Sequence, residues 1–271
     1  NALLKKRVTA LAYEFIEDKV GGMPIVRAMS EIAGSTVMLI AAEYLSTANK
    51  GRGIILGGIT GVPPTKVVIL GAGTVAEYAA RAALSLGAEI QVFDNHLYKL
   101  RRIKHTLGHQ FYTSTIDAIA LSESLKNADV VVGALRAEKG KVRHVVSEEM
   151  VSHMKPDSLI IDLSIDQGGC IATSETTTLS KPTFRKYDVI HYCVPNVASR
   201  VANTATNALS NIFIPTILRA AEEGGVDDMI FLHKWFMKGV YTYKGVLTSE
   251  PIARKFGMKF KNIELIIAAR V

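Results

Sequence analysis

The sequence contains few of the residues that mark disulfide-rich or metal-binding proteins. Its two cysteines, Cys170 and Cys193, form neither a C-x-x-C pair nor part of a histidine cluster, and no N-x-[ST] sequon occurs. This pattern argues against a disulfide framework and against a zinc site, and it fits a reducing compartment. We therefore expect a cytoplasmic protein with no metal.

Long apolar runs and concentrated charge are also missing. The longest apolar stretches, such as Val37–Ala42, are much shorter than the roughly 20 residues that a transmembrane helix needs. The 32 Lys and Arg outnumber the 25 Asp and Glu but are scattered, and the densest basic run is Lys99–Lys104. That run falls in a predicted helix, so we interpret it as a solvated helix face. We expect no membrane partner and no nucleic-acid partner.

What is present is a repeating alternation of apolar strands and helices. Short, β-branched runs without polar interruption predict strands that are buried on both faces, as in a parallel sheet covered by helices. The predicted strands are Val67–Leu70, Ile90–Phe93, Val130–Val132, Leu159–Leu163 and Val189–Val194, and the predicted helices between them are Val75–Leu86, Leu97–Leu107, Ile116–Lys126 and Glu148–Met154.

The ends of the chain have a different pattern. Residues 9–13 are a short strand candidate, residues 27–46 predict a long helix, and the glycines and prolines of residues 51–64 predict a tight loop or hairpin. A long helix over residues 203–223 leaves the alternating unit. We predict that the last stretch, residues 224–271, is helical, with helices at Met229–Met237 and Ser249–Phe256.

A glycine-rich motif follows the first strand of the alternating unit. Lys66–Leu70 leads into Gly71-Ala72-Gly73-Thr74-Val75-Ala76, and a predicted helix follows. In a G-x-G-x-x-A turn, Gly71 permits the sharp bend, Gly73 lets a pyrophosphate approach the backbone, and Ala76 allows close packing of helix on strand. The helix N-terminus offers N–H groups to the phosphates. A glycine turn without a ligand is the alternative, but the strand before and the helix after favour dinucleotide binding.

Asp94 stands where the motif needs an acidic residue. It closes the next strand, 21 positions after Gly73, where a carboxylate accepts the ribose hydroxyls. An anion at that place repels a 2′-phosphate, so NAD is the expected cofactor. Lys99, Arg101 and Arg102 follow within two helical turns and leave a phosphate-holding alternative open.

These features predict an α/β protein with a doubly wound Rossmann domain at residues 24–204. Residues 1–23 and 205–271 flank this domain. In such sheets the ligand lies beyond the carboxyl ends of the strands. Asp166 follows the strand 158–164 and precedes Gly168 and Gly169. It is a candidate catalytic carboxylate there, and a turn or helix-cap residue is the alternative.

The chain resembles the alanine dehydrogenase family, which is related to the NAD(H)-binding subunit of transhydrogenase. The segments that carry the resemblance are residues 12–14, 29–34, 51–62, 71–76 with Asp94, 128–134, 154–156, 165–169 and 241–245. The run Ile-Asp-Gln-Gly-Gly at 165–169 is the most specific of them and favours alanine dehydrogenase over transhydrogenase.

The resemblance implies roles for individual residues. Asp166 would be the catalytic carboxylate beside the nicotinamide. Ser30 would lie by the pyrophosphate, Asp94 and Lys99 near the adenosine ribose, and Ser114 at the adenine end. Ala134 and Leu135 would line the cofactor path, and Val194, Asn196 and Val197 would surround the nicotinamide and its ribose.

The resemblance also implies that residues 1–23 and 205–271 belong to a second, split substrate domain, and it implies an activity and a missing part. The implied reaction is NAD-dependent, reversible oxidative deamination of L-alanine to pyruvate and ammonium by a homo-oligomer, a dimer or hexamer. The chain departs from the family's pattern at 136–141 and at 196–204, and no segment corresponds to the family's preceding half, which supplies a substrate-binding Lys and His. We therefore expect an incomplete active site in this chain. The alternatives are another amino- or imino-acid dehydrogenase and a non-enzymatic, transhydrogenase-like NAD(H)-binding module.

Overall fold

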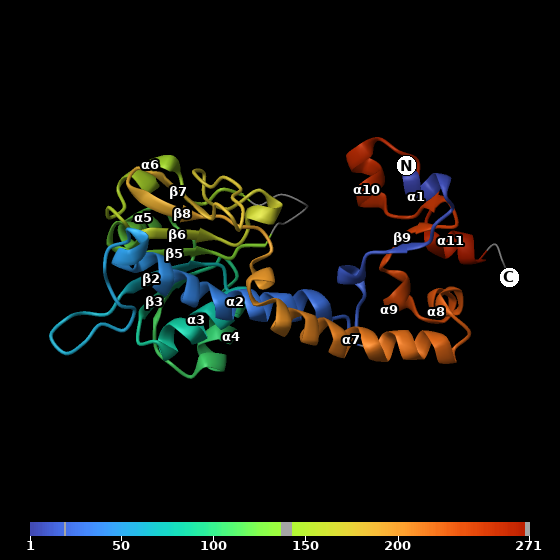
Figure 1. Ribbon diagram of the computed structural model, residues 1–271, viewed down its shortest axis with the longest axis horizontal. Helices are drawn as coiled ribbons and strands as arrows, with labels where there is room; N and C mark the ends of the chain where they lie inside the picture. The colour runs from blue at the N-terminus through green and yellow to red at the C-terminus, as the bar shows by residue number, and fades with distance from the viewer. Residues whose placement is uncertain (19, 137–142, 269–271) are drawn as a thin grey trace. The chain divides into compact units, whose positions relative to one another are not determined.

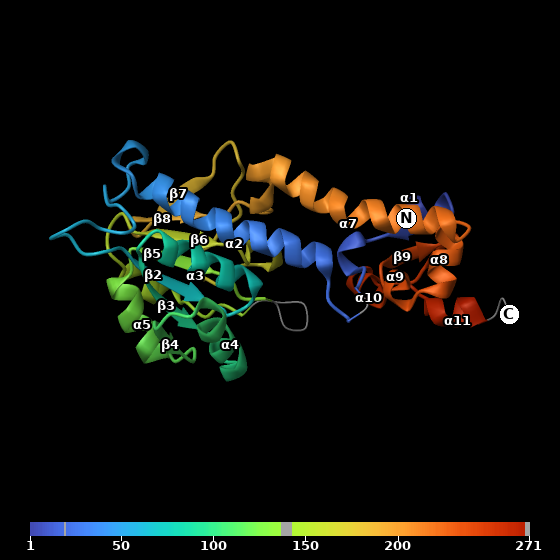
Figure 2. The ribbon, with the colours of Figure 1, turned by 90° about the horizontal axis from the view of Figure 1, so that it is seen from below.

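The computed structural model describes residues 1–18, 20–136 and 143–268. The chain forms two compact units (Figures 1 and 2): Ser30–Ala202 is one, and Asn1–Met29 with Asn203–Val271 is the other. The first is called the central unit and the second the terminal unit. The assignment of the terminal segments to a substrate domain stays a prediction. The divergent loop that begins at Arg136 lies mostly outside the described residues, because 137–142 are among those omitted.

The central unit is built on a seven-stranded sheet in the order β4-β3-β2-β5-β6-β8-β7. Only β7 is antiparallel to its neighbour. The chain winds outward from β2 to β4 and then returns to the other side of β2, where it forms β5. This reversal is the topological switch point of a doubly wound sheet, and it confirms the predicted fold class. The strands are β2 (Lys66–Leu70), β3 (Glu89–Phe93), β4 (Tyr112–Ser114), β5 (Val130–Gly133), β6 (Leu159–Asp162), β7 (Thr183–Lys186) and β8 (Val189–Tyr192).

Helices cover both faces of this sheet (Figure 1). Successive strand residues point to opposite faces. Val67 and Ile69 therefore pack with α2, α3 and α4, whereas Val68 and Leu70 pack with α5 and α6. Burial on both faces explains why the strands are apolar without alternation. The helices are α2 (Pro24–Leu45), α3 (Thr74–Ser85), α4 (Leu97–Leu107), α5 (Ala118–Asn127) and α6 (Glu148–Ser152).

Two strands of the sheet, β4 and β7, were not predicted from the sequence. Both lie at edges of the sheet, where one side of the strand has no neighbour. β4 has three residues, and β7 consists of Thr-Phe-Arg-Lys with no buried position. Neither contains the apolar run by which buried strands are recognised.

The predicted turn at 51–64 contains an antiparallel bridge between Ile59 and Val62.

The terminal unit contains a three-stranded antiparallel sheet in the order β1-β9-β10. The interpretation of 224–271 as wholly helical is wrong at 240–247, which forms the hairpin of β9 (Val240–Tyr243) and β10 (Val246–Leu247). The predicted helix Met229–Met237 is interrupted at His233, whose backbone is extended. The remaining elements are α1 (Ala2–Lys5), β1 (Ala10–Leu11), α7 (Ala202–Glu222), α8 (Val226–Leu232), α9 (Lys234–Met237), α10 (Glu250–Phe256) and α11 (Ile263–Ala268).

Helix α2 is long and apolar enough to cross a membrane by length and composition alone. The expectation from the sequence considered only uninterrupted apolar runs such as Val37–Ala42, which are much shorter than the helix. Val37, Ile40, Ala41 and Leu45 of this helix are buried against the sheet of the central unit. Their burial accounts for the apolar residues on the face of α2 that meets the sheet.

Candidate functional site

The predicted site residues of the central unit gather along one edge of the sheet. Leu70 pairs with Phe93 on one side and with Gly133 on the other, and Gly133 pairs in turn with Asp162. Because these strands are parallel and in register, the residues that follow them emerge at the same edge. The chain thereby brings together Gly71, Asp94, Ala134 and the loop that carries Asp166.

The glycine turn after β2 has the geometry that its sequence predicts. Gly71 has a φ of +108°, and a Cβ there would lie 2.6 Å from the carbonyl oxygen of Ala134. Gly73 has an ordinary φ of −82° and is the N-cap of α3, but a Cβ there would meet nothing within 4 Å. Gly71 is therefore required by the protein itself, whereas the space above Gly73 is open. Ala76 is fully buried, where α3 packs on the sheet.

Helix α2 closely approaches the first turn of α3. A Cβ on Gly34 would lie 2.4 Å from the carbonyl oxygen of Val75. Ser30 precedes Gly34 by one helical turn and therefore shares its face of α2. This face is the one that meets the start of α3, beside the glycine turn.

Asp94 lies beneath the glycine turn and is only 4% exposed. Its Oδ2 accepts a hydrogen bond from the N–H of Ala72 at 2.8 Å, and its Oδ1 accepts one from the N–H of His96 at 2.8 Å. Nδ1 of His96 lies 2.9 Å from the same Oδ1. Ser114, at the end of β4, accepts the N–H of Asp94 through its carbonyl oxygen.

Two residues of this cluster were not assigned to the site from the sequence. Arg102 donates from Nη2 to the carbonyl oxygen of Ala72 at 2.9 Å, so the peptide groups on both sides of Ala72 are held by side chains. His96 contacts Asp94 directly, and Lys99 Nζ lies 3.4 Å from His96 Nδ1. Arg102 was recognised only as a basic residue near the ribose, and only its helical spacing after Asp94 pointed to it.

The loop after β6 places two carboxylates in different surroundings. Asp166 lies in the short 3-10 helix Ile165–Gln167, is exposed, and makes no hydrogen bond in the part of the chain that the structure describes. Asp162 is 1% exposed and accepts the N–H groups of Ser164 and Cys170, each at 3.0 Å. Desolvation by burial raises the pKa of Asp162. Asp162 therefore has the loop-capping role that the sequence left open for Asp166.

The loop after β5 is tied to the same region. The Ser164 hydroxyl donates to the carbonyl oxygen of Leu135 at 2.8 Å, and the N–H of Ala134 donates to the carbonyl oxygen of Leu70 at 2.8 Å. Both predicted path residues, Ala134 and Leu135, are half-buried. They join the glycine turn to the Asp166 loop.

Three predicted residues follow β8 and differ in exposure. Val194 and Val197 are 3% and 4% exposed and belong to the core between the sheet and α2. Asn196 is exposed, with a φ of +53°. Asn196 is therefore the exposed residue of the three.

The nearby titratable groups fit a structural role. His191 is fully buried beside Thr173, and burial lowers its pKa to about 4, so the imidazole is neutral. The thiols of Cys170 and Cys193 are buried and free, and burial raises the pKa of both. No cluster of potential metal ligands occurs within residues 1–18, 20–136 and 143–268.

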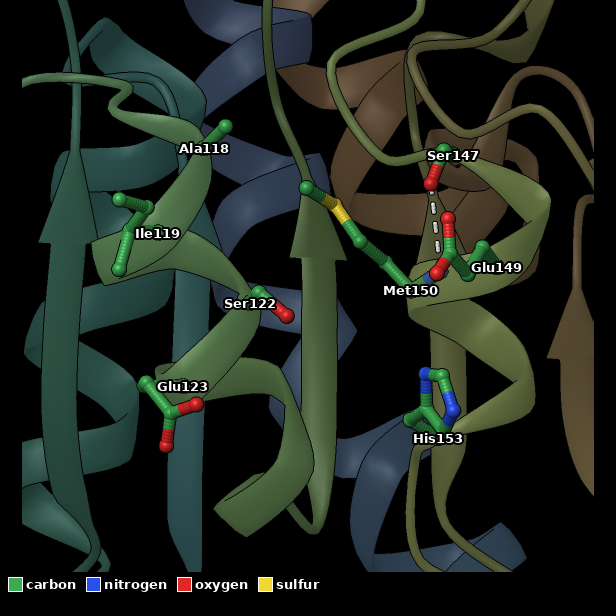
Figure 3. Close-up of a pocket in the computed structure, with 8 residues that line it drawn as sticks. All are labelled: Ala118, Ile119, Ser122, Glu123, Ser147, Glu149, Met150 and His153. Carbon is green, nitrogen blue, oxygen red and sulfur yellow. Dashed lines mark hydrogen bonds between the residues drawn. The ribbon is translucent and has the colours of Figure 1, made fainter.

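A hollow of about 290 Å³ lies between α5 and α6 and is shown in Figure 3. Met150 reaches from α6 toward α5. Glu123 lines the hollow from α5, and His153 lines it from the end of α6. None of the predicted site residues lines it. The hollow is therefore separate from the candidate site at the strand ends.

Comparison with known proteins gives a consistent result. A family profile described as "Alanine dehydrogenase/PNT, C-terminal domain" matches residues 37–250. The chain is 37% identical to alanine dehydrogenase of Mycolicibacterium smegmatis over 268 residues, covering 99% of this chain and 72% of that protein. It is 36% identical to alanine dehydrogenase of Methanococcus maripaludis, covering 97% of this chain and 70% of that protein.

Two solved structures show the same fold. An L-alanine dehydrogenase superimposes with a TM-score of 0.89 at 32% identity, covering 94% of this chain and 70% of that one. The transhydrogenase from Sinorhizobium meliloti superimposes with a TM-score of 0.76 at 19% identity, covering 91% of this chain and 70% of that one. The second likeness concerns the fold alone.

Proposed function

Because the chain belongs to the alanine dehydrogenase/PNT family, we propose that it catalyses the reversible oxidative deamination of L-alanine to pyruvate and ammonium, with NAD as the hydride acceptor. The observation that carries this proposal is the 37% identity to an alanine dehydrogenase across 99% of the chain. Transhydrogenase shares only the fold at 19% identity. These two identities favour an NAD-dependent oxidoreductase over a non-enzymatic, transhydrogenase-like binding module.

The described residues fit a dinucleotide at the carboxyl edge of the sheet. The open space above Gly73 and the N–H groups at the start of α3 suit a pyrophosphate. The Asp94 carboxylate beneath the turn disfavours a 2′-phosphate, which supports NAD over NADP. When bound there, NAD would supply the acceptor for the hydride from the α-carbon of alanine. Ser30, Lys99, Ser114, Ala134, Leu135, Val194, Asn196 and Val197 complete the proposed cofactor contacts.

Asp166 is the proposed catalytic carboxylate. It stands at the edge where the nicotinamide end of a dinucleotide is expected, and its exposed side chain is not used to cap the loop. A carboxylate there can accept a proton from the water that attacks the imine and can stabilise the positive charge on the iminium nitrogen. Its loss should reduce the rate by about 10²–10⁴-fold, the usual range for general acid–base groups.

Self-association and a cytoplasmic location are further parts of the proposal. Leu39, Ile55 and Leu86 of the central unit are 61%, 65% and 43% exposed. Ile55 and Leu86 line one hollow of the central unit, and apolar surface that is contiguous in this way marks sites that bind a protein partner. A homo-oligomer, dimer or hexamer, would cover them, and sedimentation equilibrium measures its size.

Isotope transfer tests the reaction itself. The intact enzyme is incubated with NAD+ and L-alanine that carries deuterium at C2. We expect deuterated NADH and pyruvate in equal amounts, and slower turnover with other small amino acids. NADH formation that depends on a different amino acid, or none that depends on any, would contradict the assignment.

A further inference from the structure

The buried carboxylate of Asp162 binds the chain on both sides of Asp166. Its Oδ1 accepts the N–H of Ser164 at 3.0 Å, two positions before Asp166. Its Oδ2 accepts the N–H of Cys170 at 3.0 Å and the hydroxyl of Ser174 at 2.8 Å, both after Asp166. The two oxygens of one side chain therefore hold the two ends of the loop.

Two glycines leave the space that this carboxylate occupies. A Cβ on Gly169, whose φ is +76°, would lie 2.9 Å from Oδ2 of Asp162. A Cβ on Gly133, which pairs with Asp162 where β5 meets β6, would lie 2.8 Å from its Oδ1. Gly169 ends the run 165–169, which is the most specific segment of the family resemblance. The buried carboxylate accounts for that glycine without a ligand.

The backbone of the loop connects Asp162 to Asp166. The N–H of Gln167 donates to the carbonyl oxygen of Ser164 at 2.9 Å, which closes a turn around Asp166. The N–H of Ser164 is bound by Asp162, and its hydroxyl donates to the carbonyl oxygen of Leu135 at 2.8 Å. A shift of the Asp162 carboxylate would therefore move this turn relative to Leu135, on the proposed cofactor path.

We propose that Asp162 and Ser174 are positioning residues for the deamination reaction, which hold Asp166 where it exchanges a proton with the reacting water. This inference rests on the proposed function. Asp162 is 1% exposed and its oxygens are bound by the protein. It therefore affects the rate through the place of Asp166 and not by contact with the substrate.

The rate should be sensitive to that place. A general acid–base group must lie within hydrogen-bond reach of the proton that it transfers, and a misplacement of about 1 Å can cost about 10²-fold in rate. Within the described ranges the side chain of Asp166 makes no hydrogen bond, so the loop backbone sets its position. Asparagine at position 162 would hold the loop less well, because an amide has one acceptor oxygen where a carboxylate has two.

Steady-state turnover of L-alanine and NAD+ by the intact enzyme tests this inference. Ser174→Ala removes one hydrogen bond of the carboxylate and leaves both N–H contacts, so the fold should be retained. We expect kcat to fall about tenfold, with the KM for alanine and the dissociation constant for NADH within about twofold. Ser174→Thr keeps the hydroxyl and should keep the kcat of the parent. Asp162→Asn should lower kcat further, by about 10²-fold, and Ser174→Ala decides if that variant does not fold.

A double variant separates positioning from general support of the fold. In Asp166→Asn the charge that must be placed is already absent, so adding Ser174→Ala should lower the remaining kcat by less than about twofold. Thr65→Val is the matched control. It also removes a hydroxyl that donates to a backbone carbonyl, that of Ile55 at 3.0 Å, but it does so before the start of β2, at the opposite end of the strand from the glycine turn. Its kcat should equal that of the parent.

Three results would overturn the inference and leave the proposed function intact. The first is a folded Ser174→Ala enzyme with the kcat of the parent. The second is an equal loss of kcat from Ser174→Ala with and without the Asp166 carboxylate. The third is a dissociation constant for NADH that rises as much as kcat falls, since the hydrogen bonds would then serve cofactor binding. A parent that forms no NADH from alanine would overturn both the inference and the proposed function.

Discussion

The hydroxyl of Ser174 donates a hydrogen bond of 2.8 Å to Oδ2 of Asp162, at the end of β6. The same oxygen accepts the N–H of Cys170, and Oδ1 accepts the N–H of Ser164. Asp162 therefore ties both ends of the Asp166 loop to one buried carboxylate.

The burial of Asp162 predicts a pH-dependent contribution to stability. Desolvation raises its pKa in the folded protein above the ordinary 3.8, so the folded state holds this proton more tightly than the unfolded chain does. The stabilisation that comes from the protonated Asp162 side chain is complete below pH 3.8. It is lost as the pH rises through the raised pKa of Asp162 in the folded protein. Relative to Asp162→Asn, the parent's free energy of unfolding should fall over this range, by about 1.4 kcal/mol for each unit of pKa difference.

Urea unfolding of the parent and Asp162→Asn from pH 3.5 to pH 7 measures this difference. Asp117→Asn is the control, because Asp117 is an exposed cap of α5 and asparagine caps helices equally well. If the free energy of unfolding of the parent instead rose relative to that of Asp162→Asn as the pH increases, the prediction would be contradicted.

The two glycines of the turn should respond differently to substitution. Gly71→Ala places a Cβ 2.6 Å from the Ala134 carbonyl at a φ of +108°. It should destabilise the protein by about 1–3 kcal/mol or more. Gly73→Val meets no protein atom within 4 Å at its Cβ, so it should keep the fold and lose NADH binding.

Thermal unfolding and NADH fluorescence titration on the same samples distinguish the two effects. Tight NADH binding by folded Gly73→Val would show that the pyrophosphate does not lie over this turn. A Gly71→Ala protein as stable as the parent would contradict the packing argument.

Arg102 should contribute to cofactor binding by holding the glycine turn. Its hydrogen bond to the Ala72 carbonyl is worth about 1 kcal/mol, so Arg102→Met should raise the dissociation constant for NADH about fivefold. Arg101→Met is the matched control, since Arg101 is exposed on the same helix and should leave NADH binding unchanged. Equal effects of the two variants would indicate general loss of positive charge instead.

Local sequence patterns were sufficient for the glycine turn and the buried strands. The turn at Gly71 is set by a few neighbouring residues and one backbone angle, so it is readable from the motif. The edge strand Thr183–Lys186 could not be found in this way, because it owes its conformation to pairing with β8 rather than to an apolar run. The hairpin at 240–247 carried a usable signal, since Val-Tyr-Thr-Tyr alternates before Lys244-Gly245.

The site was predicted less completely than the fold, because side-chain partners depend on tertiary structure. Asp94 was recognised from its spacing, but the imidazole of His96 against its Oδ1 depends on the turn that follows β3. Asp162 was read as part of a strand, although its carboxylate closes a loop through residues up to 12 positions later. Only the folded chain shows which of the two aspartates, Asp162 or Asp166, is left exposed.

The most direct test of the account is the turnover number for alanine oxidation by the intact Asp166→Asn enzyme, measured beside its dissociation constant for NADH. Asparagine preserves the size of the side chain and removes the charge. We expect kcat to fall by about 10²–10⁴-fold, with NADH binding within a few-fold of the parent. A kcat close to that of the parent would contradict the catalytic role of Asp166. Parallel loss of NADH binding and rate would make Asp166 a cofactor ligand, which contradicts the role as well.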